Sequence, residues 1–331
     1  MSPVTGTGAD TPDIEEDSVS TEGGTRAIIA ALTANLGIAA TKFVAYLLTR
    51  SSSMLAESIH SVADSGNQVL LLVGGKRASR QATPEHPFGY GRERYVYAFI
   101  VSIVLFSVGG LFALYEAWHK WSHPEPIEGF WWWTPLVVLV VSIGLEGYSF
   151  RTAIRESNHT RAGRTWPDFV RTAKSPELPV VLLEDSAALI GLVFALFGVG
   201  LTLLTHDGRW DAVGTAFIGI LLVTVAAVLA VEMNSLLVGE SATAEHVRAI
   251  EAALVGGCVK RIIHMKTLHL GPEELLVAAK IAVGPQERAS DVATAIDDAE
   301  RRVREAVPIA RVIYLEPDID REPTTPVVPG D

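Results

Sequence analysis

Apolar residues in this chain gather into six long runs separated by polar loops, and hydrophobic residues make up 49% of the sequence. Each run comes close to the roughly 20 residues that an α-helix needs to cross the hydrocarbon core of a bilayer. The pattern therefore predicts an α-helical membrane protein, a six-transmembrane-helix bundle with helices at residues 27–48, 54–75, 96–118, 132–150, 178–204 and 212–238.

Beyond residue 239 these runs give way to the shorter periods of a folded soluble domain. Val277, Ala279 and Ile281 alternate with other residues, as in a strand that has one buried face. The pattern predicts helix, strand, strand, helix and strand at residues 243–255, 259–270, 274–283, 290–307 and 309–315. This order favours a C-terminal cytoplasmic α+β ferredoxin-like domain, which is small and would gain buried surface by dimerisation.

The two ends of the chain have the composition of disordered segments. Residues 1–25 are acidic and rich in small residues, and they lack the basic start and apolar core of a signal peptide. The other end, from residue 319, is rich in proline. We therefore expect a disordered tail at 1–25, a transmembrane domain at 26–240, an α-β-β-α-β dimerisation domain at 241–318 and a disordered tail at 319–331.

The charges of the loops predict the orientation in the membrane. Loop 76–94 contains five Lys and Arg residues and loop 151–174 contains six, whereas the opposite loops contain one each. Because cytoplasmic loops carry the excess of positive charge, both termini are expected in the cytoplasm, with the chain in the plasma (inner) membrane. The net charge of −11 argues against nucleic acid as a partner, and the single Cys258 excludes an intrachain disulfide.

The second run is the least apolar because polar residues recur along it at helical spacing. His60 and Asp64 are four residues apart and share one helix face, close to Glu57, Asn67 and Gln68. Imidazole and carboxylate together suit a borderline divalent cation, and such groups inside a membrane are costly unless they have a function. The alternative is a set of interhelical hydrogen bonds that only hold the bundle together.

The fifth run carries two adjacent acids, Glu184 and Asp185. Neighbouring residues on a helix point about 100° apart, so both can face one ion only if the helix rotates or the longer Glu184 reaches round. The alternative is that the membrane segment ends at Leu183. For two further polar groups, Glu146 and Lys42, neutralisation within the bundle and a role in transport both remain open.

Other candidate ligands are less concentrated. Loop 86–92 contains one histidine, His86, and its glycines favour a structural loop. The C-terminal segment scatters its candidates, and His264 and His269 have opposite parity within one predicted strand, so they should face opposite sides. The scattered candidates are His246, Cys258, His264, His269, Glu316 and Asp318.

Four features together resemble the cation diffusion facilitator family over about residues 26–318. They are HSVAD at 60–64, HPFGYGRERY at 86–95, an acidic motif in the fifth run and a small α+β tail. The sequence LLEDSAAL at 182–189 is similar to the branch that includes zinc transporter nine. The resemblance implies a homodimeric antiporter, not an enzyme, that exports zinc or a similar ion from the cytoplasm in exchange for protons.

The resemblance also implies a metal site with two ligands from the second helix and two from the fifth. His60, Asp64 and Asp185 match three of these positions, while the fourth falls on Val181, which cannot coordinate. Glu184, Asn67 or water is expected to complete the set. A ligand set with one imidazole is chemically harder than a set with two imidazoles. Manganese, iron, cobalt and nickel are therefore candidate ions beside zinc.

Two other functions compete with transport. The gap at Val181 favours a non-transporting metal-binding regulator or partner subunit. An intramembrane metal-dependent hydrolase would also use these ligands to activate a water, but the sequence contains no second motif such as H-E-x-x-H. A proton antiporter agrees with the ligand chemistry, because metal ligands must lose their protons to bind.

Overall fold

The computed structural model describes residues 15–49, 52–124, 132–161 and 163–320. Side chains are not described at residues 15–23, 49, 52–57, 59, 60 and 63, a set that includes Glu57 and His60. The predicted tail at 319–331 lies almost wholly outside the described residues.

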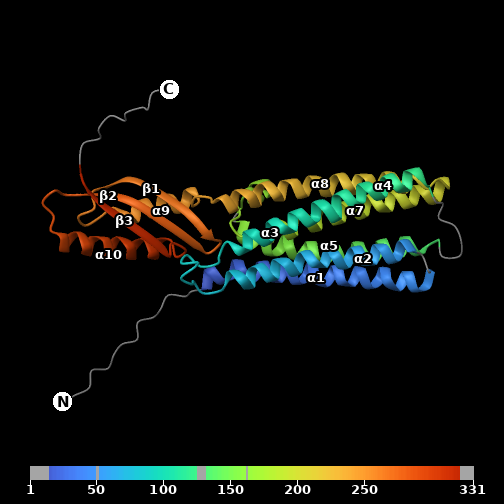
Figure 1. Cartoon of the computed structure of the whole chain (residues 1–331). Helices are drawn as coiled ribbons and strands as arrows, with labels where there is room; N and C mark the ends of the chain where they lie inside the picture. Colours follow the sequence, from blue (N-terminus) through green and yellow to red (C-terminus); the bar gives the residue numbers. More distant parts are fainter. Residues whose placement is uncertain (1–14, 50–51, 125–131, 162, 321–331) are drawn as a thin grey trace, which may run out of the picture.

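A bundle of long helices forms one end of the molecule (Figure 1). α3, η1 and α4 follow one another without a break and make a single rod. The helices of the bundle are α1 (Glu15–Thr49), α2 (Ser52–Ala78), α3 (Glu93–Val104), η1 (Leu105–Leu111), α4 (Phe112–Ser122), α5 (Thr134–Arg161), α7 (Glu177–Thr205) and α8 (Arg209–Val238).

Among the described residues, five rods are long and apolar enough to cross a membrane, and the chain is an integral multi-pass membrane protein. These rods are residues 24–48, 93–122, 134–161, 177–205 and 209–238. α2 has 27 residues, enough to span a bilayer, but its polar residues keep it out of this group. A count of six transmembrane helices therefore depends on α2 and stays a prediction.

α1 begins earlier than the sequence pattern predicts. Residues 15–25, which we expected to be part of a disordered tail, belong to this helix. Starting a new helix is costly, but extending a helix that has already formed adds one hydrogen bond for each residue that is fixed. A polar segment can therefore be helical where it continues a stable membrane helix.

The third rod contains a π-helical segment that the sequence pattern does not predict. Seven residues, Leu105–Leu111, are wound as a π-helix between α3 and α4. Gly110 lies in this segment, and a Cβ atom added to it would sit 2.6 Å from Val223 Cγ2 on α8. The glycine thus permits a close approach of the rod to α8 at the site of the irregularity.

The C-terminal domain follows the predicted order of elements. A sheet with strand order β1-β2-β3 has β1 antiparallel and β3 parallel to β2. Its elements are α9 (Ala244–Leu254), β1 (Arg261–Gly271), β2 (Glu274–Val283), α10 (Ala289–Ala306) and β3 (Val312–Ile319). A complete ferredoxin-like fold has one strand more than the described part of this domain, so that assignment stays a prediction.

One face of the sheet forms the core of the C-terminal domain. Leu275, Val277 and Ala279 alternate along β2 and are buried against both helices. Ile250 of α9 and Val303 of α10 complete the contact, and both are fully buried. The alternation predicted for the second strand is therefore confirmed. The opposite face of the sheet carries polar and exposed residues such as Lys266 and Tyr314.

The C-terminal domain meets the bundle at the loop after α2 and at the start of α7 (Figure 1). A Cβ atom on Gly91 would sit 2.8 Å from the Leu270 carbonyl oxygen, so the loop packs tightly on the β1–β2 turn. Arg94 pairs with Glu177 at 3.4 Å and with Glu273 at 3.9 Å. These contacts join α3, α7 and the C-terminal domain at one end of the bundle.

Candidate functional site

α2 turns a polar face toward the interior of the bundle. Ser58, Ser61 and Ser65 are buried, as are Asn67 and Gln68, while Asp64 is half-buried. Lys42 Nζ on α1 donates to Ser61 Oγ at 2.9 Å, and Asn35 Nδ2 donates to Gln68 Oε1 at 3.3 Å. These bonds attach α2 to α1, as expected of polar groups between membrane helices.

α7 continues unbroken through the two adjacent acids. Glu184 and Asp185 are 8% and 2% exposed and lie in the first third of a 29-residue helix. The helix therefore does not end at Leu183, and the apolar rod that contains both acids runs from residue 177 to residue 205. An unbroken apolar helix keeps its backbone bonded, so two acids can stay inside it when neighbouring helices supply hydrogen bonds.

Glu184 is held from α2 by two side-chain amides. Asn67 Nδ2 donates to Glu184 Oε1 at 2.9 Å, and Gln68 Nε2 donates to Glu184 Oε2 at 3.0 Å. Both oxygens of the carboxyl group are thus bonded across the interface between α2 and α7. These two bonds link α2 to α7.

Asp185 points to a different helix. Ser149 Oγ on α5 donates to Asp185 Oδ2 at 2.6 Å, and both groups are buried. The two acids of α7 therefore bond to α2 and α5 respectively, consistent with the 100° between neighbouring residues on a helix. In this arrangement they do not converge on one point.

The third helix facing this interior, α5, contributes a further acid. Glu146 is 5% exposed and lies one turn from Ser149, on the buried face of α5. From the sequence alone, both neutralisation within the bundle and a role in transport are open for Glu146. Ser142, one turn further along the same face, is also buried.

A metal-coordinating geometry is not formed among the side chains that the structure describes. Within them, no three histidine, cysteine, aspartate or glutamate residues lie close enough to hold one ion. His60 lies on α2 one turn before Asp64, but its side chain is outside the described part of the chain. The convergence of His60 with Asp185 therefore stays a prediction, as do the roles of Asp64, Glu184 and Asn67.

Val181 is fully buried among apolar neighbours near the same end of α7. The side chain offers no donor atom and is packed into the core that α1, α3, α5 and α8 share. Any fourth ligand for an ion at Asp185 must therefore come from another position.

The loop after α2 is held by its own side chains. The His86 ring stacks on Tyr90 at 4.6 Å between centroids, and the Tyr90 hydroxyl lies 3.2 Å from Thr83 Oγ1. The guanidinium group of Arg80 lies over the Tyr90 ring, with Cζ 4.6 Å from the ring centroid. These contacts support the structural interpretation of this loop.

The histidines of β1 face opposite sides, as their parity predicts: His264 is exposed and His269 is buried. Burial lowers the pKa of His269 to about 4, and its Nδ1 lies 3.3 Å from the Gly271 carbonyl oxygen. The acids Glu316 and Asp318 both contact Lys280 Nζ, at 3.0 and 3.4 Å. The candidate ligands of this domain thus have other partners or lie apart.

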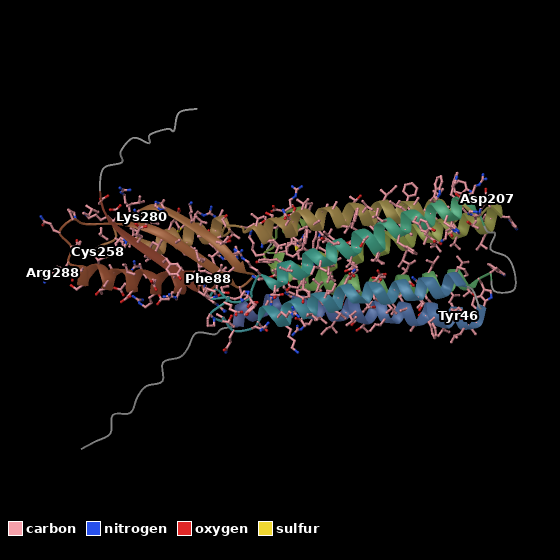
Figure 2. All side chains as sticks on the ribbon, in the orientation of Figure 1. Tyr46, Phe88, Asp207, Cys258, Lys280 and Arg288 are labelled. Atoms are coloured by element: carbon pink, nitrogen blue, oxygen red, sulfur yellow. The ribbon has the colours of Figure 1, made fainter. Side chains whose placement is uncertain are left out.

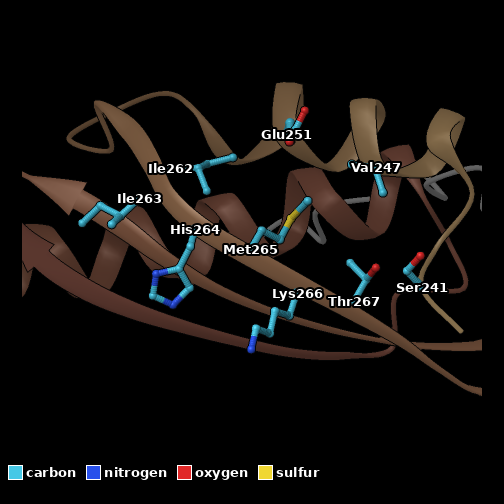
Figure 3. A pocket seen from close by; sticks show the side chains of 9 residues that line it. All are labelled: Ser241, Val247, Glu251, Ile262, Ile263, His264, Met265, Lys266 and Thr267. Atoms are coloured by element: carbon cyan, nitrogen blue, oxygen red, sulfur yellow. The ribbon is translucent and has the colours of Figure 1, made fainter. Parts of the chain in front are cut away.

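A cavity in the C-terminal domain lies between α9 and β1 (Figure 3). Val247 and Glu251 line it from α9, and His264 and Lys266 belong to its β1 side. It is separate from the buried acids, which lie within the bundle. The labelled Lys280 and Cys258 mark this domain in Figure 2, whereas Tyr46 and Asp207 mark the far end of the bundle.

Comparisons with known proteins agree with this architecture. Residues 28–238 match the family described as the cation efflux transmembrane domain. A protein of Xenopus laevis named proton-coupled zinc antiporter SLC30A9, mitochondrial, is 33% identical over 243 residues, which are 72% of this chain and 43% of that protein. The Homo sapiens protein of the same name is 32% identical over 243 residues, 72% of this chain and 42% of that protein.

A plant protein, metal tolerance protein C4 of Arabidopsis thaliana, is 30% identical over 221 residues, 65% of this chain and 47% of that protein. The chain thus spans less than half the length of these relatives. The family comprises membrane transporters of metal cations rather than enzymes. On these matches the chain belongs to the cation diffusion facilitator (cation efflux) family, in the branch of the SLC30A9 proteins.

Proposed function

We propose that this protein is a divalent metal cation efflux transporter, a zinc/proton antiporter that exports metal from the cytoplasm by alternating access. The observation that carries the proposal is the burial of Asp185 and Glu184 inside a membrane helix, where each is bonded to a neighbouring helix of the bundle. Acids buried in a membrane domain are costly to keep, and they mark ion and proton pathways in transporters.

The transport site in this proposal consists of His60, Asp64 and Asp185, with Glu184 and Asn67 as additional ligands. Family membership supports the match of the first three residues to the ligand positions of cation diffusion facilitators. The backbone arrangement is compatible with this, since α2 and α7 both face the polar interior. Coordination of one ion by both acids would require Asp64 and Asp185 to approach each other more closely.

Zinc is the proposed ion, with manganese, iron, cobalt and nickel as alternatives. The relatives from Xenopus laevis and Homo sapiens are named as proton-coupled zinc antiporters, which supports zinc and protons as the exchanged pair. The single imidazole and the carboxylates around it also suit ions that are harder than zinc. The carboxylate and imidazole ligands can take up protons when the ion leaves, which would couple release to a proton gradient.

For the orientation we propose cytoplasmic termini in a plasma or inner membrane. The excess of Lys and Arg in loops 76–94 and 151–174 supports this orientation. The SLC30A9 relatives from Xenopus laevis and Homo sapiens are mitochondrial by name, so the same orientation in a mitochondrial membrane is the competing location. We further propose a homodimer formed through the C-terminal domain, whose sheet carries one face without a helix packed on it.

The proposal is tested by ion flux into proteoliposomes loaded with a fluorescent metal indicator. Uptake of zinc should depend on the protein and rise several-fold when a pH gradient is imposed in the exchanging direction. Flux of zinc, manganese, cobalt and nickel measured side by side would rank the ions. Metal binding by the purified protein without any flux would instead support the non-transporting regulator, and a hydrolytic product without flux would support the hydrolase.

A further inference from the structure

The interior between α2, α5 and α7 contains one acid that the transport site described above leaves unused. Glu146 on α5 is 5% exposed. It belongs to the buried face of that helix, together with Ser142 and Ser149. Ser149 bonds to Asp185, so the face that carries Glu146 is the one that α5 turns toward the acids of α7.

Glu146 is electrostatically coupled to the acids of two other helices. The carboxyl groups of Asp185, Glu184 and Asp64 act on it, as does the ammonium group of Lys42 on α1. Lys42 itself donates to Ser61 Oγ at 2.9 Å and thus lies one turn from Asp64 along α2. Carboxyl groups from α2, α5 and α7 thus lie in the same part of the bundle, although no three of them are close enough to hold one ion among the described side chains.

Neutral oxygen atoms without a hydrogen bond face the same interior. Asn67 is 1% exposed, and its Oδ1 has no partner among the described groups, although its Nδ2 binds Glu184. Ser142, also 1% exposed, has an Oγ with no partner there either. A buried oxygen atom without a hydrogen bond destabilises the fold. Such atoms are what a cation would use.

We propose that Glu146 is an ion-binding residue of the transport site, which contributes from α5 the further ligand that Val181 on α7 cannot supply. This inference rests on the proposed transport function. The site then has an acid from each of three helices, Asp64, Glu146 and Asp185, beside His60. A ligand set dominated by carboxylates favours manganese and iron more than a two-imidazole set does.

The test measures zinc and manganese binding to the purified full-length protein by isothermal titration calorimetry, followed by flux in proteoliposomes. Glu146→Gln keeps the shape but removes the charge, and should weaken binding of both ions at least tenfold, with the larger loss for manganese. Glu146→Asp keeps the charge but shortens the side chain by one methylene group. Its affinities for both ions should lie between those of the unchanged protein and those of Glu146→Gln. Glu156→Gln is the matched control, since it lies on the same helix roughly 15 Å away along the axis.

Several results would overturn the inference. One such result is that Glu146→Gln binds both ions with affinities within twofold of the unchanged protein while Asp185→Ala abolishes binding. This result would exclude Glu146 from the site and would not contradict the proposed transport function. Restoration of binding by Lys42→Met in the Glu146→Gln background would show that Glu146 only balances the charge of Lys42. If Glu146→Gln does not fold, Glu146→Asp with unchanged affinities has the same meaning.

Failure of the proposed function would give a different pattern. If the protein is not a transporter, the unchanged protein itself gives no zinc flux in proteoliposomes, whatever the effect of Glu146→Gln on binding. If only the site is assigned wrongly, Asp185→Ala and Asp64→Ala transport as the unchanged protein does. Flux of the unchanged protein thus tests the function, and binding by Glu146→Gln tests the inference.

Discussion

The two sides of α7 are built in different ways. Toward α2 and α5 the helix presents Glu184 and Asp185, and side-chain hydrogen bonds bridge the space between the helices. Toward α8 it presents Gly198, where an added Cβ atom would sit 2.9 Å from the Trp210 carbonyl oxygen. One side depends on polar side chains that can change partners, and the other on backbones in direct contact.

The difference indicates which interface can open. Side-chain hydrogen bonds can exchange a protein partner for an ion or water at modest cost, since each bond is worth about 0.5–1.5 kcal/mol net. Close contact at a glycine leaves no space for sliding without repacking, because protein interiors are as dense as crystals. We expect α7 and α8 to move together, and the polar side toward α2 and α5 to be where access changes.

The largest effect is expected at Asp185. Asp185→Ala removes a proposed ligand and should lower zinc flux in proteoliposomes at least a hundredfold. The dimer and monomer distribution in size-exclusion chromatography should not change, because the acid contributes one hydrogen bond to the fold. Asp207→Ala, in the exposed turn after α7, is the control and should transport normally. Normal flux in Asp185→Ala would end the assignment of the polar side as the ion pathway.

The glycine side should affect stability rather than transport chemistry. Gly198→Ala introduces a methyl group against the backbone of α8 and should lower the free energy of unfolding by about 1–3 kcal/mol, measured by thermal melting in detergent. Gly200→Ala lies on the same helix with nothing within 4 Å of the added atom. That control should be neutral or slightly stabilising, because alanine favours helix over glycine by about 1 kcal/mol. Equal effects of both variants would contradict the close-packing account.

A smaller loss of flux is expected at the amide that holds Glu184. Asn67→Ala leaves the buried Glu184 Oε1 without its donor and should lower flux about tenfold, since a buried acceptor without its partner costs about 1–3 kcal/mol. Asn158→Ala, exposed on α5, is the matched control. If Asn67→Ala transports as well as the control, the bridge between α2 and α7 has no part in transport.

The smallest expected effect is the contribution of His269 to the pH dependence of stability. Measuring it distinguishes the pH dependence of folding from that of transport. Its folded pKa of about 4 is below the ordinary 6.5, so the unfolded state binds more protons between these values. Stability is therefore full above pH 6.5 and is lost as the pH falls toward 4, by about 1 kcal/mol between pH 7 and 5.5. His269→Gln should abolish this slope in thermal melting, and His264→Gln, exposed on the same strand, should keep it.

Much of the architecture could be predicted from periodicity alone. The apolar runs locate the membrane helices to within four residues, except that α1 begins twelve residues earlier and α5 ends eleven residues later than predicted. The strand from 274 to 283 has the predicted limits. The earlier start of α1 and the π-helix at Leu105–Leu111 could not be predicted in this way. The first depends on helix propagation from a stable core and the second on packing against α8, and neither leaves a periodic signal.

The candidate site was only partly accessible from the sequence. The acids on α7 and the amides on α2 stand out because polar residues are rare in apolar runs. Their partners do not: Ser149 is one of many serines, and nothing in the sequence connects it with Asp185. Glu146 stood out as polar, yet its proximity to the acids of other helices required the packing of α5.

Membrane insertion and the presence of acids inside the membrane domain follow from the amino-acid sequence, because hydrophobic runs and charges are properties of individual residues. Which helix each acid faces follows from the packing of the folded bundle. Glu184 bonds to α2 and Asp185 to α5 because helix rotation is set by side-chain packing over the whole bundle, with Gly198 against α8 on the other side. That rotation is a collective result, and no local pattern encodes it.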